Sequence, residues 1–184
     1  MQIDQDFFEA FMARSPKPFF HIDWTGSVKP KTFVQRTKLD CRANPAINAF
    51  AADLELDGLT HFGEKHLWGD RTEWATACRE LMCEWIRRER HKEEISRLHC
   101  LFGTETLAEA QQFAELHKVE AHSIWKVQAI DFSGKKDMNW FDKPGTLMEK
   151  LYYADCYWRG MPADDTPIWE ILLYPSIYID ERVQ

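Results

Sequence analysis

The sequence predicts an α+β protein with much antiparallel sheet. Segments with the 3.6-residue spacing of amphipathic helices are interspersed with segments in which apolar and polar residues alternate, and this order of elements favours antiparallel strands. The 184 residues can enclose one full core, and 45% hydrophobic with 29% charged residues is typical of a folded globular chain. We therefore expect an N-terminal arm at 1–18 and a single domain at 19–184.

The first third of the chain contains a helix, a strand and a second helix. Residues 1–15 form an amphipathic helix with an aromatic face, which we expect to dock on the domain itself or on a partner, the domain being the default. An apolar run at 19–24 predicts the first strand, which a turn at 25–27 ends. Residues 45–54 predict a helix, whereas the rest of 29–70 carries no clear pattern.

The clearest helix spans residues 72–90. Thr72 can cap its N-terminus, and Glu84 precedes Arg88 by four residues, so these two side chains can pair on the surface. Its apolar side chains form one stripe, the face that an amphipathic helix turns to the core. The members of this stripe are Trp74, Cys78, Leu81, Met82, Trp85 and Ile86.

Residues 96–114 predict a strand, a tight turn and a helix. Gly103 ends a short apolar run, Thr104 or Thr106 can cap the helix after it, and apolar residues then recur at helical spacing. Such a turn exposes backbone N–H groups and the face of Phe102 beside a helix N-terminus, which suits a ligand with a flat ring and polar groups. The alternative is an ordinary strand-to-helix corner with Phe102 in the core.

The last third predicts mainly strands. Residues 123–132 alternate as a half-buried strand does, and 147–158 form an element dense in aromatic residues. Two closing strands, separated by a proline, are expected at 168–174 and 177–179.

Composition excludes several classes of function. A net charge of −7 argues against stable coating of nucleic acid, which requires an excess of basic residues. Five cysteines without a CxxC pair, no signal-peptide pattern and no membrane-length apolar run indicate a reduced, cytoplasmic protein without a membrane partner. The histidines share no ligand spacing with the cysteines, so no metal site is expected.

Three features on separate predicted strands carry residues suited to chemistry. They are His21, the segment Phe102-Gly103-Thr104, and Glu170. Glu170 lies inside an apolar, β-prone run, where a carboxylate either points outward on an exposed sheet face or lines a cleft.

Together these features resemble the ADP-ribosyltransferase superfamily. Its members place a histidine or arginine on a first strand, an aromatic or Ser/Thr strand leading into a helix, and a glutamate on a late strand. The chain further resembles an uncharacterised bacterial family, known only as a domain of unknown function and placed in that superfamily. The resembling segments are FHIDWTGSVKP at 20–30, EWIRRERHKEEISRLHCLFGTETLAEAQQF at 84–113, and YWRG with a downstream WEILLYP within 157–175.

The resemblance implies split antiparallel sheets, an NAD cleft and flanking helices, with NAD as co-substrate. Glu170 would stabilise the positive charge that develops on the ribose as nicotinamide leaves, and it could take a proton from the acceptor. His21 would hydrogen-bond a ribose hydroxyl, Phe102 would stack on nicotinamide, and Thr104 could bond a ribose or the cofactor amide.

Three further residues are candidates for the cofactor wall or its phosphates: Trp24, Ser27 and Arg97. Their alternative roles are a core tryptophan, a turn serine and a surface arginine. No Rossmann GxGxxG or P-loop offers another way to hold NAD.

The chain departs from the superfamily pattern at two positions. Phe102 stands where tyrosine is common, and it can stack but cannot donate a hydrogen bond. Ile168 stands at the upstream position of the Gln/Glu-x-Glu motif that often helps select the acceptor, so a protein arginine acceptor is disfavoured.

We expect transfer of ADP-ribose to a macromolecule, either a protein side chain or a base of single-stranded nucleic acid. The aromatic segment 152–158, with Arg159 and Lys135-Lys136, could stack and steer such a base; its alternative is an aromatic core beside a solvated turn. The resemblance implies a toxin or phage-conflict context, in which an inhibitory partner would fit, and water could replace the acceptor. The alternative is a non-catalytic nucleotide-binding or protein-interaction module of the same fold.

Overall fold

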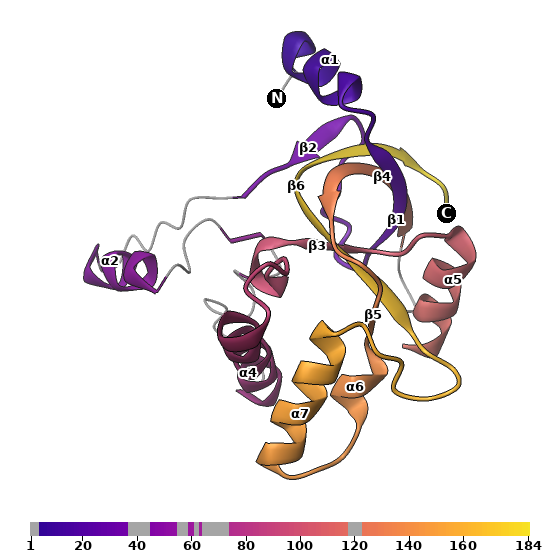
Figure 1. Ribbon diagram of the computed structural model, residues 1–184. Coiled ribbons are helices and arrows are strands. Elements are labelled where there is room, and N and C mark those ends of the chain that lie inside the picture. The colour runs from indigo at the N-terminus through magenta and orange to yellow at the C-terminus, as the bar shows by residue number, and fades with distance from the viewer. Residues whose placement is uncertain (1–3, 37–44, 55–58, 61–62, 64–73, 118–122) are drawn as a thin grey trace.

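The computed structural model describes most of the chain, namely residues 4–36, 45–54, 59–60, 63, 74–117 and 123–184 (Figure 1). Its helices are α1 (Gln5–Ala13), α2 (Pro45–Asp53), α4 (Trp74–Arg90), the 3₁₀ turn η1 (Arg97–His99), α5 (Leu107–Leu116), α6 (Asn139–Asp142) and α7 (Leu147–Trp158). Its strands are β1 (Lys17–Asp23), β2 (Thr32–Val34), β3 (Leu101–Gly103), β4 (Ser123–Phe132), β5 (Lys136–Asp137) and β6 (Trp169–Arg182). The chain is thus a mixed α/β protein with a six-stranded antiparallel sheet.

Strand β6 is the centre of the sheet, because it pairs with β2, β3, β4 and β5. The two closing strands expected from the sequence are therefore one strand, and the separation at Pro175 was wrong. The register between β4 and β6 shifts at this point: Tyr174 lies opposite Asp131, whereas Ile177 lies opposite Ala129. Such a bulge tolerates a proline, which has no N–H to offer to the ladder.

Four of the strands close into a ring. β1 pairs with β4, β4 with β6, and β6 with β3. The ring is completed by Phe20 of β1 and Thr104, just after β3, whose backbone N–H and C=O groups exchange hydrogen bonds of 3.0 and 2.9 Å. Alternate residues point inward and fill the ring with apolar side chains. The buried members of this interior are Phe19, Trp125, Val127, Ala129, Ile171, Leu173, Ile177 and Ile179.

The N-terminal helix docks on the domain, as expected by default. The rings of Phe7 and Phe11 lie 4.8 and 5.1 Å from the ring of Phe33 on β2, and Phe8 lies 4.9 Å from Tyr178 on β6. Figure 1 shows this indigo helix at one end of the molecule, beside β2.

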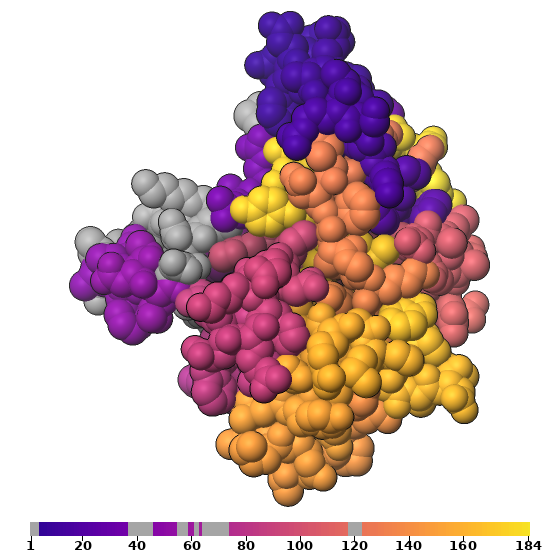
Figure 2. All heavy atoms as spheres, viewed as in Figure 1, coloured from indigo at the N-terminus to yellow at the C-terminus, as the bar shows by residue number. Residues whose placement is uncertain are grey.

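Helices cover the outside of the ring. In Figure 1, α5 runs alongside β1, while α4, α6 and α7 lie together at the end opposite α1. The space-filling view shows α6 and α7 (orange) forming that end, with α2 projecting to one side (Figure 2). Among the described residues, no helix has the length and apolar character needed to cross a membrane.

Helix α4 buries a face other than the apolar stripe expected from the sequence. Trp74, Leu81 and Trp85 are exposed, Trp74 with 83% of its surface. The expectation was wrong because the two glutamates on the opposite face have arginine partners, which make their burial possible. Thr72, the expected cap, lies outside the described residues. The residues that α4 buries are Ala77, Glu80, Cys83 and Glu84.

Candidate functional site

The structure brings the three resembling segments onto neighbouring strands. β1 meets β3 at the bridge between Phe20 and Thr104, and β3 pairs with β6 along its whole length. His21 lies on β1, Phe102 on β3 and Glu170 on β6.

The side chains on these strands point in different directions. His21 lies opposite Trp125, a member of the ring interior. Phe102 lies opposite Leu172 on the outer face, and Glu170, two residues before Leu172, points to that face as well. Phe102 and Glu170 therefore share the side covered by the helices, whereas His21 belongs to the ring interior.

Glu170 is buried and held through one of its oxygens. Its Oε1 accepts a hydrogen bond of 2.7 Å from the hydroxyl of Tyr157 on α7 and a second, charge-assisted bond from Nη1 of Arg97 on η1. The same Nη1 donates to the Tyr157 oxygen at 2.7 Å. Glu170 thus neither points outward from an exposed face nor stands alone, and its side chain is only 5% exposed.

Arg97 connects Glu170 to helix α4. Its Nε donates to Oε2 of Glu80 at 2.8 Å, and Arg79 Nε lies 3.5 Å from Oε1 of the same carboxylate. The alternative of a surface arginine at position 97 was therefore wrong, because the guanidinium is buried between two carboxylates. We call Glu80, Arg97, Tyr157 and Glu170 the buried ionic cluster.

Aromatic rings enclose the guanidinium of Arg97. Its central carbon lies 4.7 Å from the ring centres of Phe102 and Phe141, and 5.2 Å from that of Tyr157. This is the distance range of cation–π contacts, which strengthen when the cation is desolvated. The half-buried ring of Phe102, expected to stack on nicotinamide, thus has Arg97 against it.

Burial and charge act on the cluster in opposite directions. Burial raises the pKa of Glu170, although Arg97 and Tyr157 favour its ionised form. Burial opposes the charge of Arg97, but Glu170 and Glu80 raise its pKa well above the usual value. Burial also raises the pKa of the Tyr157 hydroxyl, so Tyr157 remains a hydrogen-bond donor.

His21 fixes the strand that carries Phe102. Its Nδ1 lies 2.8 Å from the carbonyl oxygen of Phe102, which can only accept, so Nδ1 carries the proton. Burial lowers the pKa of His21, against the hydrogen bond to Phe102 and the charge of Asp23. The neutral ring keeps a lone pair on Nε2.

The loop after β1 presents Trp24 and is organised by Asp23. The buried Asp23 carboxylate accepts from the backbone N–H groups of Thr25, Gly26 and Val28 at 2.9–3.0 Å. Burial acts to raise the pKa of Asp23, but these bonds lower it overall. Trp24 is 53% exposed, with its ring 5.8 Å from that of Phe113, so the alternative of a core tryptophan was wrong.

Ser27 and Thr104 serve their local turns in this structure. The Ser27 oxygen lies 2.6 Å from Thr25 Oγ1 in the exposed loop, as a turn serine does. Thr104 is buried and donates to the carbonyl of Thr106 at 2.9 Å. Thr106, one of the two caps considered, begins α5 through a capping box with Glu109.

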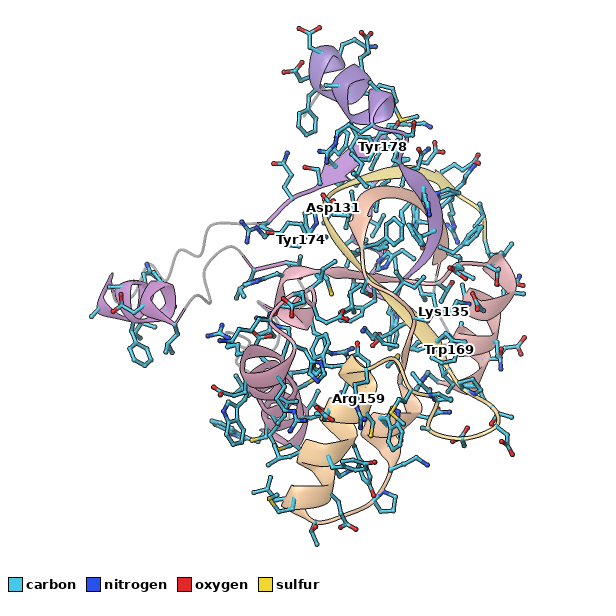
Figure 3. All side chains as sticks on the ribbon, viewed as in Figure 1. Asp131, Lys135, Arg159, Trp169, Tyr174 and Tyr178 are labelled. Atoms are coloured by element: carbon cyan, nitrogen blue, oxygen red, sulfur yellow. The ribbon has the colours of Figure 1, made fainter. Side chains whose placement is uncertain are left out.

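Most of the aromatic segment expected to face an acceptor base belongs to the core. Tyr157 and Trp158 are fully buried, and the buried Lys136 donates to the Trp158 carbonyl at 2.6 Å. Lys135 lies between α5 and β5 (Figure 3) and pairs with Glu109 at 2.8 Å. Tyr152 is the widely exposed aromatic side chain of this segment.

Sequence reasoning missed Glu80, Tyr157 and Phe141 as members of the site. A signal for Glu80 was present: Glu80 and Glu84 are one helical turn apart, beside Ala77 and Cys83 on the face opposite the apolar stripe. Nothing local marked Tyr157 or Phe141 as neighbours of Arg97. Among the described residues, no group of three or more His, Cys, Asp or Glu side chains could hold a metal ion.

Fold and site define a small mixed α/β domain with a buried ionic cluster beneath its central strand. The family described as "Protein of unknown function (DUF2441)" matches residues 29–184. The chain belongs to this family, and the expected resemblance to a domain of unknown function is confirmed. No curated protein matches the chain.

Proposed function

We propose that the chain transfers ADP-ribose from NAD to a macromolecular acceptor and releases nicotinamide. The observation that supports this most is the placement of His21, Phe102 and Glu170 on three neighbouring strands. Three segments far apart in the sequence, each resembling a superfamily motif, meet in one part of the fold. An ADP-ribosyltransferase-like fold is part of the same proposal.

The proposed reaction needs one well-placed carboxylate. The bond between the ribose C1′ and the nicotinamide nitrogen breaks, its electron pair leaves with nicotinamide, and positive charge develops on the ribose. Glu170 would stabilise that charge and accept the proton that the acceptor loses as it bonds to C1′. The raised pKa of Glu170, caused first by burial, suits a group that accepts a proton.

The structure alters the role that we propose for His21. Because its ring points into the strand ring, His21 would act by holding the carbonyl of Phe102, and with it the position of β3. Trp24, just after β1, is exposed, whereas Phe102 is half-buried. The ring of Trp24 is therefore more accessible to a ligand ring than that of Phe102.

We propose that the reaction takes place in the cytoplasm. The four cysteines in the described part of the chain are free thiols, Cys83, Cys100 and Cys156 being buried, and free thiols persist in reducing compartments. A toxin or phage-conflict effector, restrained by an inhibitory partner, is the context that the resemblance supports.

Release of nicotinamide from NAD tests the proposal. We expect Glu170→Gln, which keeps the shape of the side chain, to lower release by at least about 100-fold, the effect of removing one group that stabilises developing charge. The matched control is Glu181→Gln on the same strand, because Glu181 is 60% exposed and its carboxylate lies 3.7 Å from the ammonium group of Lys126. Equal release by wild type and Glu170→Gln, both folded, would refute the role of Glu170.

The acceptor can be identified from the same reaction in cell lysate. With NAD labelled in the ADP-ribose part, label removed by protease indicates a protein acceptor, and label removed by nuclease indicates a nucleic acid. Label in free ADP-ribose alone indicates that water is the acceptor.

A non-catalytic nucleotide-binding or protein-interaction module is the second candidate. The observation that favours it is the engagement of Glu170 by Arg97 and Tyr157, which leaves the carboxylate bonded within the protein. No nicotinamide release together with an NAD-dependent rise in melting temperature would identify a nucleotide-binding module. Neither effect from a folded chain would indicate a protein-interaction module.

A further inference from the structure

We infer that Arg97 and Tyr157 are positioning residues, which hold Glu170 by its Oε1 and leave Oε2 as the oxygen available to the substrate. This inference rests on the proposed function, and it names the two residues that orient the Glu170 carboxylate for that reaction. It assigns the buried ionic cluster a role in the reaction as well as in folding.

The geometry distinguishes the two oxygens of Glu170. Both donors, Tyr157 Oη and Arg97 Nη1, converge on Oε1, and they are bonded to each other at 2.7 Å. From the residues that the structure describes, no hydrogen bond reaches Oε2. A carboxylate held by one oxygen keeps its orientation while the other oxygen remains free to accept a bond.

Arg97 is itself fixed on several sides. Glu80 of α4 binds its Nε at 2.8 Å, and the rings of Phe102 and Phe141 lie 4.7 Å from its central carbon. Four elements, namely η1, α4, β3 and α6, therefore restrain the guanidinium. A guanidinium fixed by several helices and strands orients a reacting side chain more accurately than a group on a loop does.

The same contacts control the protonation of Glu170. Arg97 and Tyr157 favour its ionised form, whereas burial and the charge of Glu80 oppose it. The buried thiols of Cys83 and Cys100 lie close enough to the cluster to interact electrostatically with Arg97, Glu80 and Glu170. Removal of the Tyr157 hydroxyl takes away one group that stabilises the carboxylate, so Glu170 will keep its proton to a higher pH.

Tyr157→Phe tests the inference, with Tyr153→Phe as the matched control. The variant keeps the ring of Tyr157, which lies 4.7 Å from Phe141, and removes only the hydroxyl. Tyr153 lies one turn earlier on α7, and its hydroxyl donates to the Pro144 carbonyl at 3.4 Å, away from the cluster. Three quantities are measured for each variant: kcat for nicotinamide release against pH, KM for NAD, and the titration of the Glu170 carboxyl carbon by NMR.

We expect Tyr157→Phe to lower kcat about ten-fold, the effect of one lost hydrogen bond to a charged group. The acid limb of its pH profile and the NMR titration of Glu170 should both move to higher pH, and KM for NAD should stay near the wild-type value. Tyr153→Phe should match the wild type in all three. If the Tyr157 hydroxyl contributed only to stability, neither the acid limb of the pH profile nor the NMR titration of Glu170 would shift in Tyr157→Phe.

A second variant guards against a folding defect in Tyr157→Phe. Arg97→Lys keeps the positive charge, but its single ammonium group cannot span Glu80 and Glu170 as the guanidinium fork does. It should therefore lower kcat more than Tyr157→Phe does.

The outcomes separate the inference from the proposed function. Unchanged titrations of Glu170 in both variants would overturn the inference and leave ADP-ribosyl transfer standing. A wild type that releases no nicotinamide, with Glu170 titrations that move as expected, would refute the proposed function and retain the control of Glu170 by Tyr157 and Arg97.

Discussion

The interior of the strand ring and the interface between β6 and helices α4 and α7 are both deeply buried, yet their side chains differ in kind. The ring is filled mainly by apolar side chains, such as Val127 and Leu173. The interface holds Glu80, Arg97 and Glu170, whose side chains are each at most 5% exposed. Burial in the ring thus follows hydrophobicity, whereas burial at the interface depends on pairing between segments far apart in the sequence.

The difference has a physical cause. An apolar side chain gains free energy on burial wherever it is placed, because the gain scales with the area removed from water. A charged side chain is tolerated inside only when specific partners satisfy it. Glu84 illustrates this, since Arg87, Arg88 and Ser96 each bind its carboxylate at 2.8–2.9 Å.

The largest effect is expected when the interface loses its buried cation. Arg97→Met should lower the free energy of unfolding by about 3–5 kcal/mol, because Glu80 and Glu170 would both lose the buried cation that lies between them. Arg90→Met on α4 is the matched control, since Arg90 is 65% exposed and reaches Asp155 from the surface, and it should cost less than about 1 kcal/mol. Unfolding in denaturant measures both changes in the free energy of unfolding. Equal losses of stability in the two variants would show that the cluster is not paired as described.

A pair of leucines sharpens the comparison between pattern and burial. Leu173→Ala in the ring should cost about 2–5 kcal/mol, because it leaves a cavity in a filled interior. Leu81→Ala on α4 should cost well under about 1 kcal/mol, because Leu81 is exposed. If Leu81→Ala proved as costly as Leu173→Ala, the apolar stripe of α4 would be a buried face after all.

Acid should weaken the interface through Glu84. Burial acts to raise the pKa of Glu84, but bonds from Arg87 and Arg88 lower it below its usual value. The stabilisation is therefore fully present above the unfolded pKa and is lost as the pH falls through the folded pKa. Glu84→Gln should cost on the order of 2 kcal/mol at neutral pH and should flatten the loss of stability in acid.

Unfolding measured at a series of pH values checks this prediction. The control is Glu115→Gln near the end of α5, where the side chain is exposed. A pH dependence that survived in Glu84→Gln would mean that other carboxylates carry the acid sensitivity.

Much of the secondary structure could be predicted from local pattern. The helix at 45–54 and the strand at 123–132 follow from the spacing of apolar residues within each segment, and Thr106, one of the two caps that the sequence allowed, begins α5. The buried face of α4 could not be predicted in this way, because its glutamates depend on partners such as Arg97, which lies 17 residues from Glu80.

The site shows the same division. His21, Phe102 and Glu170 could be singled out by residue type and order, and their strands are neighbours in the fold. Their side-chain directions could not, because strand alternation places His21 inside the ring and Glu170 outside it once the register is fixed. The role of Tyr157 could not be predicted from the residues near it in the sequence, because its partners belong to η1 and β6.

The sequence by itself determined where helices α1, α2, α4 and α5 and strands β1, β3 and β4 form. Hydrophobic periodicity is local, and apolar burial needs no particular partner. The tertiary structure alone decided that Arg97 is buried, that α4 turns Glu80 and Glu84 inward, and that Glu170 is held by Tyr157. Charged and polar groups are buried only where partner groups bind them. These contacts depend on how β3, β6, α4 and α7 pack together.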